Sequence, residues 1–137
     1  MKLDSTIIRW IFLVPVTWAA WYTAVFLGIA ILAAGEAFCP AGRVVSGWCN
    51  ANWYSIFFES VVIFSSSLSA IFVVMVGSYM APTHRSFVAK LVFITGSAVA
   101  IFMATETQAY LALAGTLVCG LGSLWVVVKR WGRASAK

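Results

Sequence analysis

Four long stretches without a charged residue constrain this chain more than any other feature of its sequence. They cover residues 10–35, 60–84, 91–105 and 107–128, and they contain 26, 25, 15 and 22 residues. A helix needs about 20 apolar residues to cross the hydrocarbon core of a bilayer. Only 9% of the 137 residues are charged, compared with roughly 25% in soluble domains. The sequence therefore predicts an all-α, polytopic membrane protein whose four transmembrane helices form an antiparallel bundle.

The predicted helices lie at about 10–34, 53–80, 86–105 and 109–128, within a single membrane domain of residues 1–137. Because 15 residues of helix rise only about 22 Å, the third helix must also include Lys90, whose ammonium group can extend to the membrane surface. Turn-forming residues such as Pro40 and Gly47 interrupt the apolar pattern in residues 35–52. We expect this segment to be the one sizeable loop.

The basic residues predict the orientation of the chain. Cytoplasmic segments next to membrane helices carry an excess of Lys and Arg. If both termini are cytoplasmic, eight of the nine Lys and Arg residues fall on that side and only Arg43 falls outside. We therefore expect cytoplasmic N and C termini, an extracytoplasmic loop 35–52 and a location in the bacterial inner membrane. Because the basic residues flank apolar spans, we expect the lipid bilayer, and no nucleic acid, as a partner.

Two cysteines lie in the predicted external loop. Cys39 and Cys49 have nine residues between them, and outside the cytoplasm this spacing permits a disulfide bond. A structural bond that holds the loop is favoured about three to one over a redox-active pair. Cys119 lies alone in the fourth helix, where a thiol acts as a small apolar residue.

Glu59 is the acidic residue that the sequence places inside a membrane span. Acids within the membrane are costly and are often functional, which would fit a proton or cation site. The alternative is that Glu59 meets water at the membrane interface or pairs with Arg43. The sequence weighs the two interpretations equally.

Hydroxyl side chains gather near the middle of the second helix, at Ser65, Ser66 and Ser69. They could line a narrow polar path through the membrane. More often such side chains return their hydrogen bonds to nearby carbonyls and hold helices together. We therefore favour helix packing over a pore by about three to one.

Small residues recur at four-residue spacing in every predicted helix. In lipid, such stripes let helix backbones approach closely. We therefore expect them at helix contacts. The stripes are Ala20-Ala24-Gly28, Ser65-Ser69 with Ser66-Ala70, Gly96-Ala100-Ala104, and Ala112-Thr116-Gly120.

The sequence contains no motif that indicates catalysis. It has no Ser-His-Asp set and no glycine-rich phosphate loop, and its single histidine is too few for a pair of haem ligands. We therefore expect no enzyme activity, no catalytic residues, no cofactor and no metal site.

Three hypotheses about function follow. The first is a non-enzymatic membrane subunit that stabilises or docks other integral membrane subunits, or further copies of itself, in a larger complex. The second is a small oligomeric channel or transporter with Glu59 and the Ser65–Ser69 segment near its path. The third is a membrane thiol redox protein that uses Cys39 and Cys49.

Overall fold

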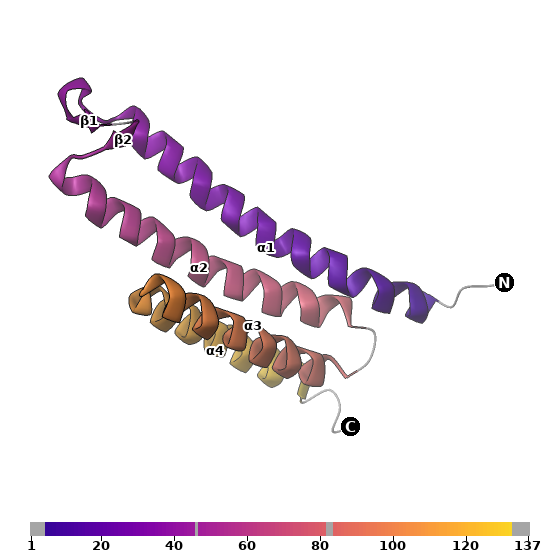
Figure 1. Ribbon diagram of the computed structural model, residues 1–137. Coiled ribbons are helices and arrows are strands. Elements are labelled where there is room, and N and C mark those ends of the chain that lie inside the picture. The colour runs from indigo at the N-terminus through magenta and orange to yellow at the C-terminus, as the bar shows by residue number, and fades with distance from the viewer. Residues whose placement is uncertain (1–4, 46, 82–83, 133–137) are drawn as a thin grey trace.

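A computed structural model describes residues 5–45, 47–81 and 84–132 of the chain (Figure 1). Four long helices dominate it, and a small two-stranded hairpin lies between the first two. In chain order, the elements are α1 (Ser5–Ala37), the short 3-10 helix η1 (Ala41–Arg43), β1 (Val44–Val45), β2 (Trp48–Cys49), α2 (Asn52–Met80), α3 (Arg85–Thr107) and α4 (Tyr110–Gly132). All four α-helices are long and apolar enough to cross a membrane, which suggests a multi-pass membrane protein.

The helices are longer than the sequence predicts, most clearly at α1. The predicted helix 10–34 begins five residues earlier, at Ser5, and continues to Ala37, so Gly35 and Glu36 are helical rather than part of the loop. A Cβ atom at Gly35 would overlap the ring of Phe57 in α2, so the two helices are in close contact there. The helix also continues through Pro15, whose missing N–H removes one hydrogen bond without ending it.

The loop between the first two helices is correspondingly shorter and partly ordered as a hairpin. The expected loop 35–52 becomes the connection between Ala37 and Asn52. Within it, β1 and β2 pair antiparallel, with Val44 opposite Cys49 and Val45 opposite Trp48.

The third and fourth helices also extend beyond their predicted bounds. The predicted third helix 86–105 becomes Arg85–Thr107, which is about 34 Å long and includes an exposed Lys90. The predicted fourth helix 109–128 becomes Tyr110–Gly132. Gln108, with a φ of 57°, turns the chain from α3 into α4.

α2 is the central helix of the bundle (Figure 1). α1 packs along one side of α2, and the α3–α4 hairpin packs along the other, so α1 makes its extensive contacts with α2 alone. Consecutive helices run antiparallel. As a result, α1 begins and α4 ends at the same end of the molecule, opposite the β1–β2 hairpin.

The best-buried cluster lies between α2, α3 and α4, towards the end where α1 begins. Val74, Ala89 and Val127 form its centre, each at most 3% exposed. Trp131 packs at its edge, where it meets Tyr79 edge to face and lies under the guanidinium of Arg85, 5.1 Å from the ring centre. These contacts join the three helices at this end.

Candidate functional site

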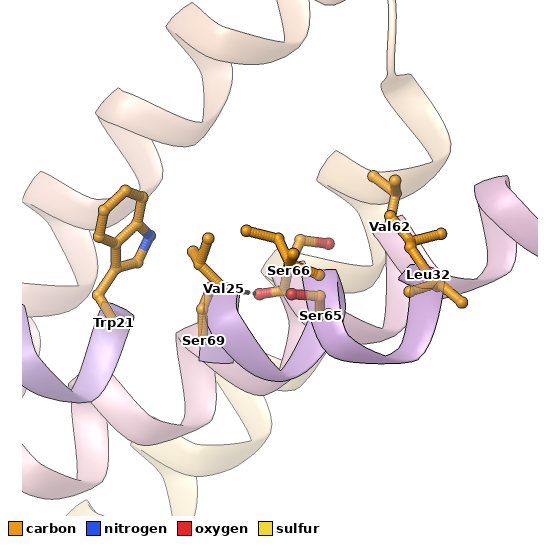
Figure 2. Close-up of a pocket in the computed structure, with 10 residues that line it drawn as sticks. Trp21, Val25, Leu32, Val62, Ser65, Ser66 and Ser69 are labelled. Carbon is orange, nitrogen blue, oxygen red and sulfur yellow. Dashed lines mark hydrogen bonds between the residues drawn. The ribbon is translucent and has the colours of Figure 1, made fainter. Parts of the chain in front are cut away.

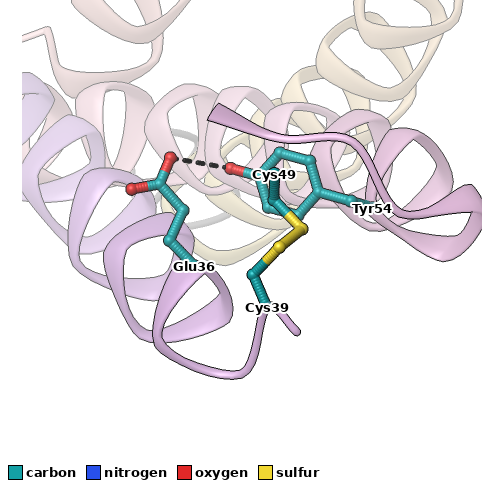
Figure 3. The surroundings of a disulfide bond; sticks show 4 residues. All are labelled: Glu36, Cys39, Cys49 and Tyr54. Carbon is teal, nitrogen blue, oxygen red and sulfur yellow. Dashed lines mark hydrogen bonds between the residues drawn. A yellow bond between two sulfur atoms is a disulfide. The ribbon is translucent and has the colours of Figure 1, made fainter. Parts of the chain in front are cut away.

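The end of the molecule opposite the chain termini carries a compact head, which we define as residues 35–58. The structure describes all of it except residue 46. A disulfide joins Cys39, just after α1, to Cys49 in β2, with their Cα atoms 5.8 Å apart (Figure 3). The backbone N–H of Asn50 donates to the carbonyl of Arg43 at 2.8 Å, which extends the hairpin pairing by one bond. Gly47 allows the tight hairpin turn because its φ of 84° is unfavourable for other residues.

A hydrogen bond between helices supports the head from below. The hydroxyl of Tyr54 in α2 donates to Oε1 of Glu36 in α1 at 2.9 Å (Figure 3). Tyr54 is only 6% exposed, although Trp53 beside it is half exposed. One turn further along α2, Phe57 fills the space beside Gly35. The disulfide, this hydrogen bond and this packing contact fix the end of α1 against the start of α2.

The fixed head nevertheless presents large apolar side chains to its surroundings. Phe38 is 80% exposed and Trp48 is 64% exposed, and Val44 and Val45 are also exposed. These four residues form what we call the apolar tip. Because the hairpin is only two residues long on each strand, it has no core in which to bury them.

The head stands beyond the end of the α3–α4 hairpin. Glu59 of α2 shares a groove with Gln108 and Tyr110 at the α3–α4 turn. The seven residues of α2 before Glu59 therefore extend about 10 Å past that turn. Figure 1 shows that the start of α2 lies beyond the connection between α3 and α4.

This geometry bears on the two interpretations of Glu59. Its side chain is exposed and level with the α3–α4 turn, rather than deep among the helices. Within the part of the chain that the structure describes, its carboxylate makes no hydrogen bond or ion pair, so of the two interfacial possibilities the pair with Arg43 is not formed. The structure thus places Glu59 beside the connection between α3 and α4, at the end of those two helices.

The serines of α2 line a lateral groove against α1 with a volume of about 280 Å³ (Figure 2). Ser65 donates from α2 to the carbonyl of Ala24 in α1 at 2.9 Å. Ser66 and Ser69 instead donate to carbonyls three residues earlier in α2, at 3.0 and 2.7 Å. The three hydroxyl donors are thus already used within the protein, as expected for helix packing.

The small-residue stripe of α1 faces α2. Ala24 is fully buried and Ala20 is 9% exposed. A Cβ atom at Gly28 would lie 2.6 Å from the hydroxyl oxygen of Ser65, so the backbones are in close contact there. Ser66-Ala70 and Ala112-Thr116 are half-buried on α2 and α4.

The stripe of α3 behaves differently along its length. Ala104 is buried and Ala100 is half-buried, but Gly96 is exposed, and a Cβ atom there would have no neighbour within 4 Å. Among the described residues, Gly96 therefore makes no close helix contact, and its expected packing role stays a prediction. At Gly120 of α4, by contrast, a Cβ atom would lie 2.8 Å from the ring of Phe93.

Two close contacts escaped the sequence analysis. At Gly115, a Cβ atom would lie 2.8 Å from the hydroxyl oxygen of Ser67, and Gly35 meets Phe57. The sequence spacing could have indicated both contacts. Gly35 follows Gly28 by seven residues, and Gly115 follows Ala112 by three. These spacings return to the same helix face as the four-residue spacing does.

Aromatic side chains form an exposed column in the middle of α1. The ring centres of Trp18, Trp21, Tyr22 and Phe26 lie 4.9–6.3 Å from their neighbours in the column. All four side chains are at least 42% exposed, and Trp21 also lines the groove between α1 and α2. Such a surface suits contact with lipid or with another membrane helix.

Among the described residues, no group of three or more His, Cys, Asp or Glu side chains could hold a metal ion. Cys119 is half-buried within α4, far along the chain from the disulfide. Comparison with models of known families, with curated proteins and with solved structures gives no match. The head and the two grooves must therefore be interpreted from their own geometry.

Proposed function

We propose that this protein is a non-enzymatic integral membrane subunit that docks a partner subunit through its head. The observation that carries the proposal is the apolar tip, Phe38, Val44, Val45 and Trp48, which is held by a disulfide beyond the level of the α3–α4 turn. Lipid tails cannot cover side chains that stand above the hydrocarbon core. Exposed apolar groups on a fixed support are typical of protein interaction sites.

The same proposal includes an orientation. In it, both termini are cytoplasmic in a bacterial inner membrane, and the head faces the extracytoplasmic side. The excess of basic residues at the ends of the chain supports this orientation. A disulfide in the head also fits an oxidising compartment.

Pre-organisation explains how such a head could bind. Ordering a flexible loop on binding costs free energy, which weakens the association. Here the disulfide and the Tyr54–Glu36 hydrogen bond order the loop beforehand. Aromatic residues such as Trp48 are also common among the residues that dominate interface energies.

The test compares complexes formed by the tagged protein in the cells from which it comes. We expect the double variant Val45→Ser/Trp48→Ser to lose a stoichiometric complex on native gels, because it removes apolar area without breaking the disulfide. Gly42→Ser is the matched control, since Gly42 lies in the same head and its Cβ would meet nothing within 4 Å. A complex that survives in both variants, or no stoichiometric complex with the unaltered protein, would refute docking through the head.

The channel and redox hypotheses make different predictions. A channel requires ion flux in liposomes that Glu59→Gln reduces. The hydroxyls of Ser65, Ser66 and Ser69 already donate hydrogen bonds to backbone carbonyls, which supports a packing role. A redox protein requires Cys39 and Cys49 to cycle between thiol and disulfide in cells, which mass spectrometry of trapped thiols would detect. We propose neither, because no contact in the described structure favours them over docking.

A further inference from the structure

We propose that the groove beside Glu59 binds the ammonium headgroup of an ethanolamine phospholipid. The groove lies between the start of α2 and the α3–α4 turn and has a volume of about 280 Å³. This volume is just below the roughly 300–1,000 Å³ of typical ligand sites, so it admits a headgroup and not a whole lipid. The proposal requires the helices to be in a bilayer but does not depend on docking through the head.

Charge selects the ligand. The groove contains one ionisable acid, Glu59, and its carboxylate makes no ion pair with a described residue. Arg43 is the sole basic residue in the described sequence between Glu36 and Glu59, and it does not line the groove. The partial charges of the α3 C-terminus and the α4 N-terminus meet at the same turn and offset one another. A cationic ligand would therefore complement the groove.

The neighbouring polar groups favour a primary ammonium group. The amide nitrogen of Gln108 donates to the carbonyl of Thr105 at 3.0 Å, which leaves the amide oxygen as an acceptor. Tyr110, which also lines the groove, offers a phenolic oxygen and an aromatic face. An –NH₃⁺ group has three donors to share among such acceptors, whereas a quaternary ammonium group has none.

The apolar wall of the groove argues that the ammonium group belongs to a lipid. Val62, Ile63 and Ala112 also line the groove. Val62 and Ile63 follow Glu59 by three and four residues and Ala112 follows Tyr110 by two, so these apolar side chains lie about one helical turn deeper along the helices than the polar ones. A molecule with its ammonium group at Glu59 would place its attached chains along this wall. Phospholipids are the abundant molecules that combine these two parts at the membrane surface.

The test is a lipid titration of the delipidated, full-length protein by native mass spectrometry. We expect dioleoyl phosphatidylethanolamine to bind more tightly than dioleoyl phosphatidylglycerol. We also expect Glu59→Gln to lower the affinity for the ethanolamine lipid about fivefold, as is usual for loss of a partly exposed ion pair. Glu106→Gln is the matched control, because Glu106 is an exposed acid near the same turn that does not line the groove. This control should bind both lipids as the unaltered protein does.

Several results would overturn the proposal. Equal binding of the two lipids would exclude recognition of the ammonium group. Equal weakening in the two variants, or no weakening in Glu59→Gln, would exclude Glu59 as its partner. Free phosphoethanolamine that binds as tightly as the lipid would show that the apolar wall holds no acyl chain. Because Glu59 is exposed, a thermal scan should find Glu59→Gln folded, so a loss of binding is interpretable.

Discussion

Single residues decide how closely the helices of this protein approach one another. Gly28 is in contact with Ser65, and that serine also bonds to the carbonyl of Ala24. A small residue and a hydroxyl therefore act together at one crossing of α1 and α2. Such pairs matter in lipid, where apolar surfaces alone give helices little reason to associate.

The first residue-scale prediction concerns this crossing. Gly28→Leu should lower the free energy of unfolding by about 1–3 kcal/mol, because the added side chain must displace Ser65. The measurement is chemical unfolding in detergent followed by circular dichroism. The matched control is Gly96→Leu, at a helical glycine whose Cβ would meet nothing within 4 Å. Equal stabilities of the two variants would contradict the close packing at Gly28.

The second residue-scale prediction concerns the hydrogen bond beneath the head. Tyr54→Phe should lower the free energy of unfolding by about 1–2 kcal/mol, since it removes the donor to Glu36 and keeps the ring. Tyr110→Phe changes an exposed phenol and should have little effect. In a Glu36→Gln background, the cost of Tyr54→Phe should become smaller. An unchanged cost there would show that Tyr54 stabilises the protein by another route.

At the scale of elements, the head is the part that depends most on covalent support. The strands β1 and β2 have two residues each, too few to form a stable hairpin alone. Cys39→Ser/Cys49→Ser should therefore lower the free energy of unfolding by about 2–4 kcal/mol and raise amide exchange in residues 38–45. Cys119→Ala, which removes a thiol outside the head, should leave that exchange unchanged. Protection that survives loss of the disulfide would mean that Tyr54 and Phe57 hold the head without it.

The elements also show how far the sequence can predict this structure. The four helices follow from charge-free stretches, because lipid forces each apolar segment to satisfy its own backbone hydrogen bonds. The hairpin does not, since each strand has only two residues, too few to show an alternating pattern. The contact between Gly35 and Phe57 was missed for another reason, because it joins two different helices.

The candidate sites could be predicted only in part. Residue type identified Glu59 and the cysteines, but the level of Glu59 depends on how far α2 extends past the α3–α4 turn. Gly96 shows that a stripe of small residues does not by itself predict a helix contact, because the same spacing occurs on faces that meet a helix and on faces that do not. Lipid and protein are equally apolar neighbours, so periodicity alone cannot distinguish them.

At the scale of the whole molecule, the four-span arrangement makes a prediction about topology. In a cysteine-free background, Gly42→Cys should react with a membrane-impermeant thiol reagent added to intact cells. Ser135→Cys, beyond the described residues, should react only after the membrane is opened. The physical reason is the excess of basic residues near the termini, which resist transfer across the membrane. Labelling of Ser135→Cys in intact cells would refute cytoplasmic termini.

The central position of α2 has a consequence for how the protein is made. Because α1 makes its extensive contacts with α2 alone, α1 has its main partner before α3 and α4 have been synthesised. Proteins begin to assemble from the N-terminus while the ribosome is still adding residues. Nascent chains arrested once α2 has entered the membrane should therefore already contain the Cys39–Cys49 bond, and gel mobility with and without reductant would detect it. The helices α3 and α4 would then pack onto an α1–α2 pair that has already formed, on the side of α2 opposite α1.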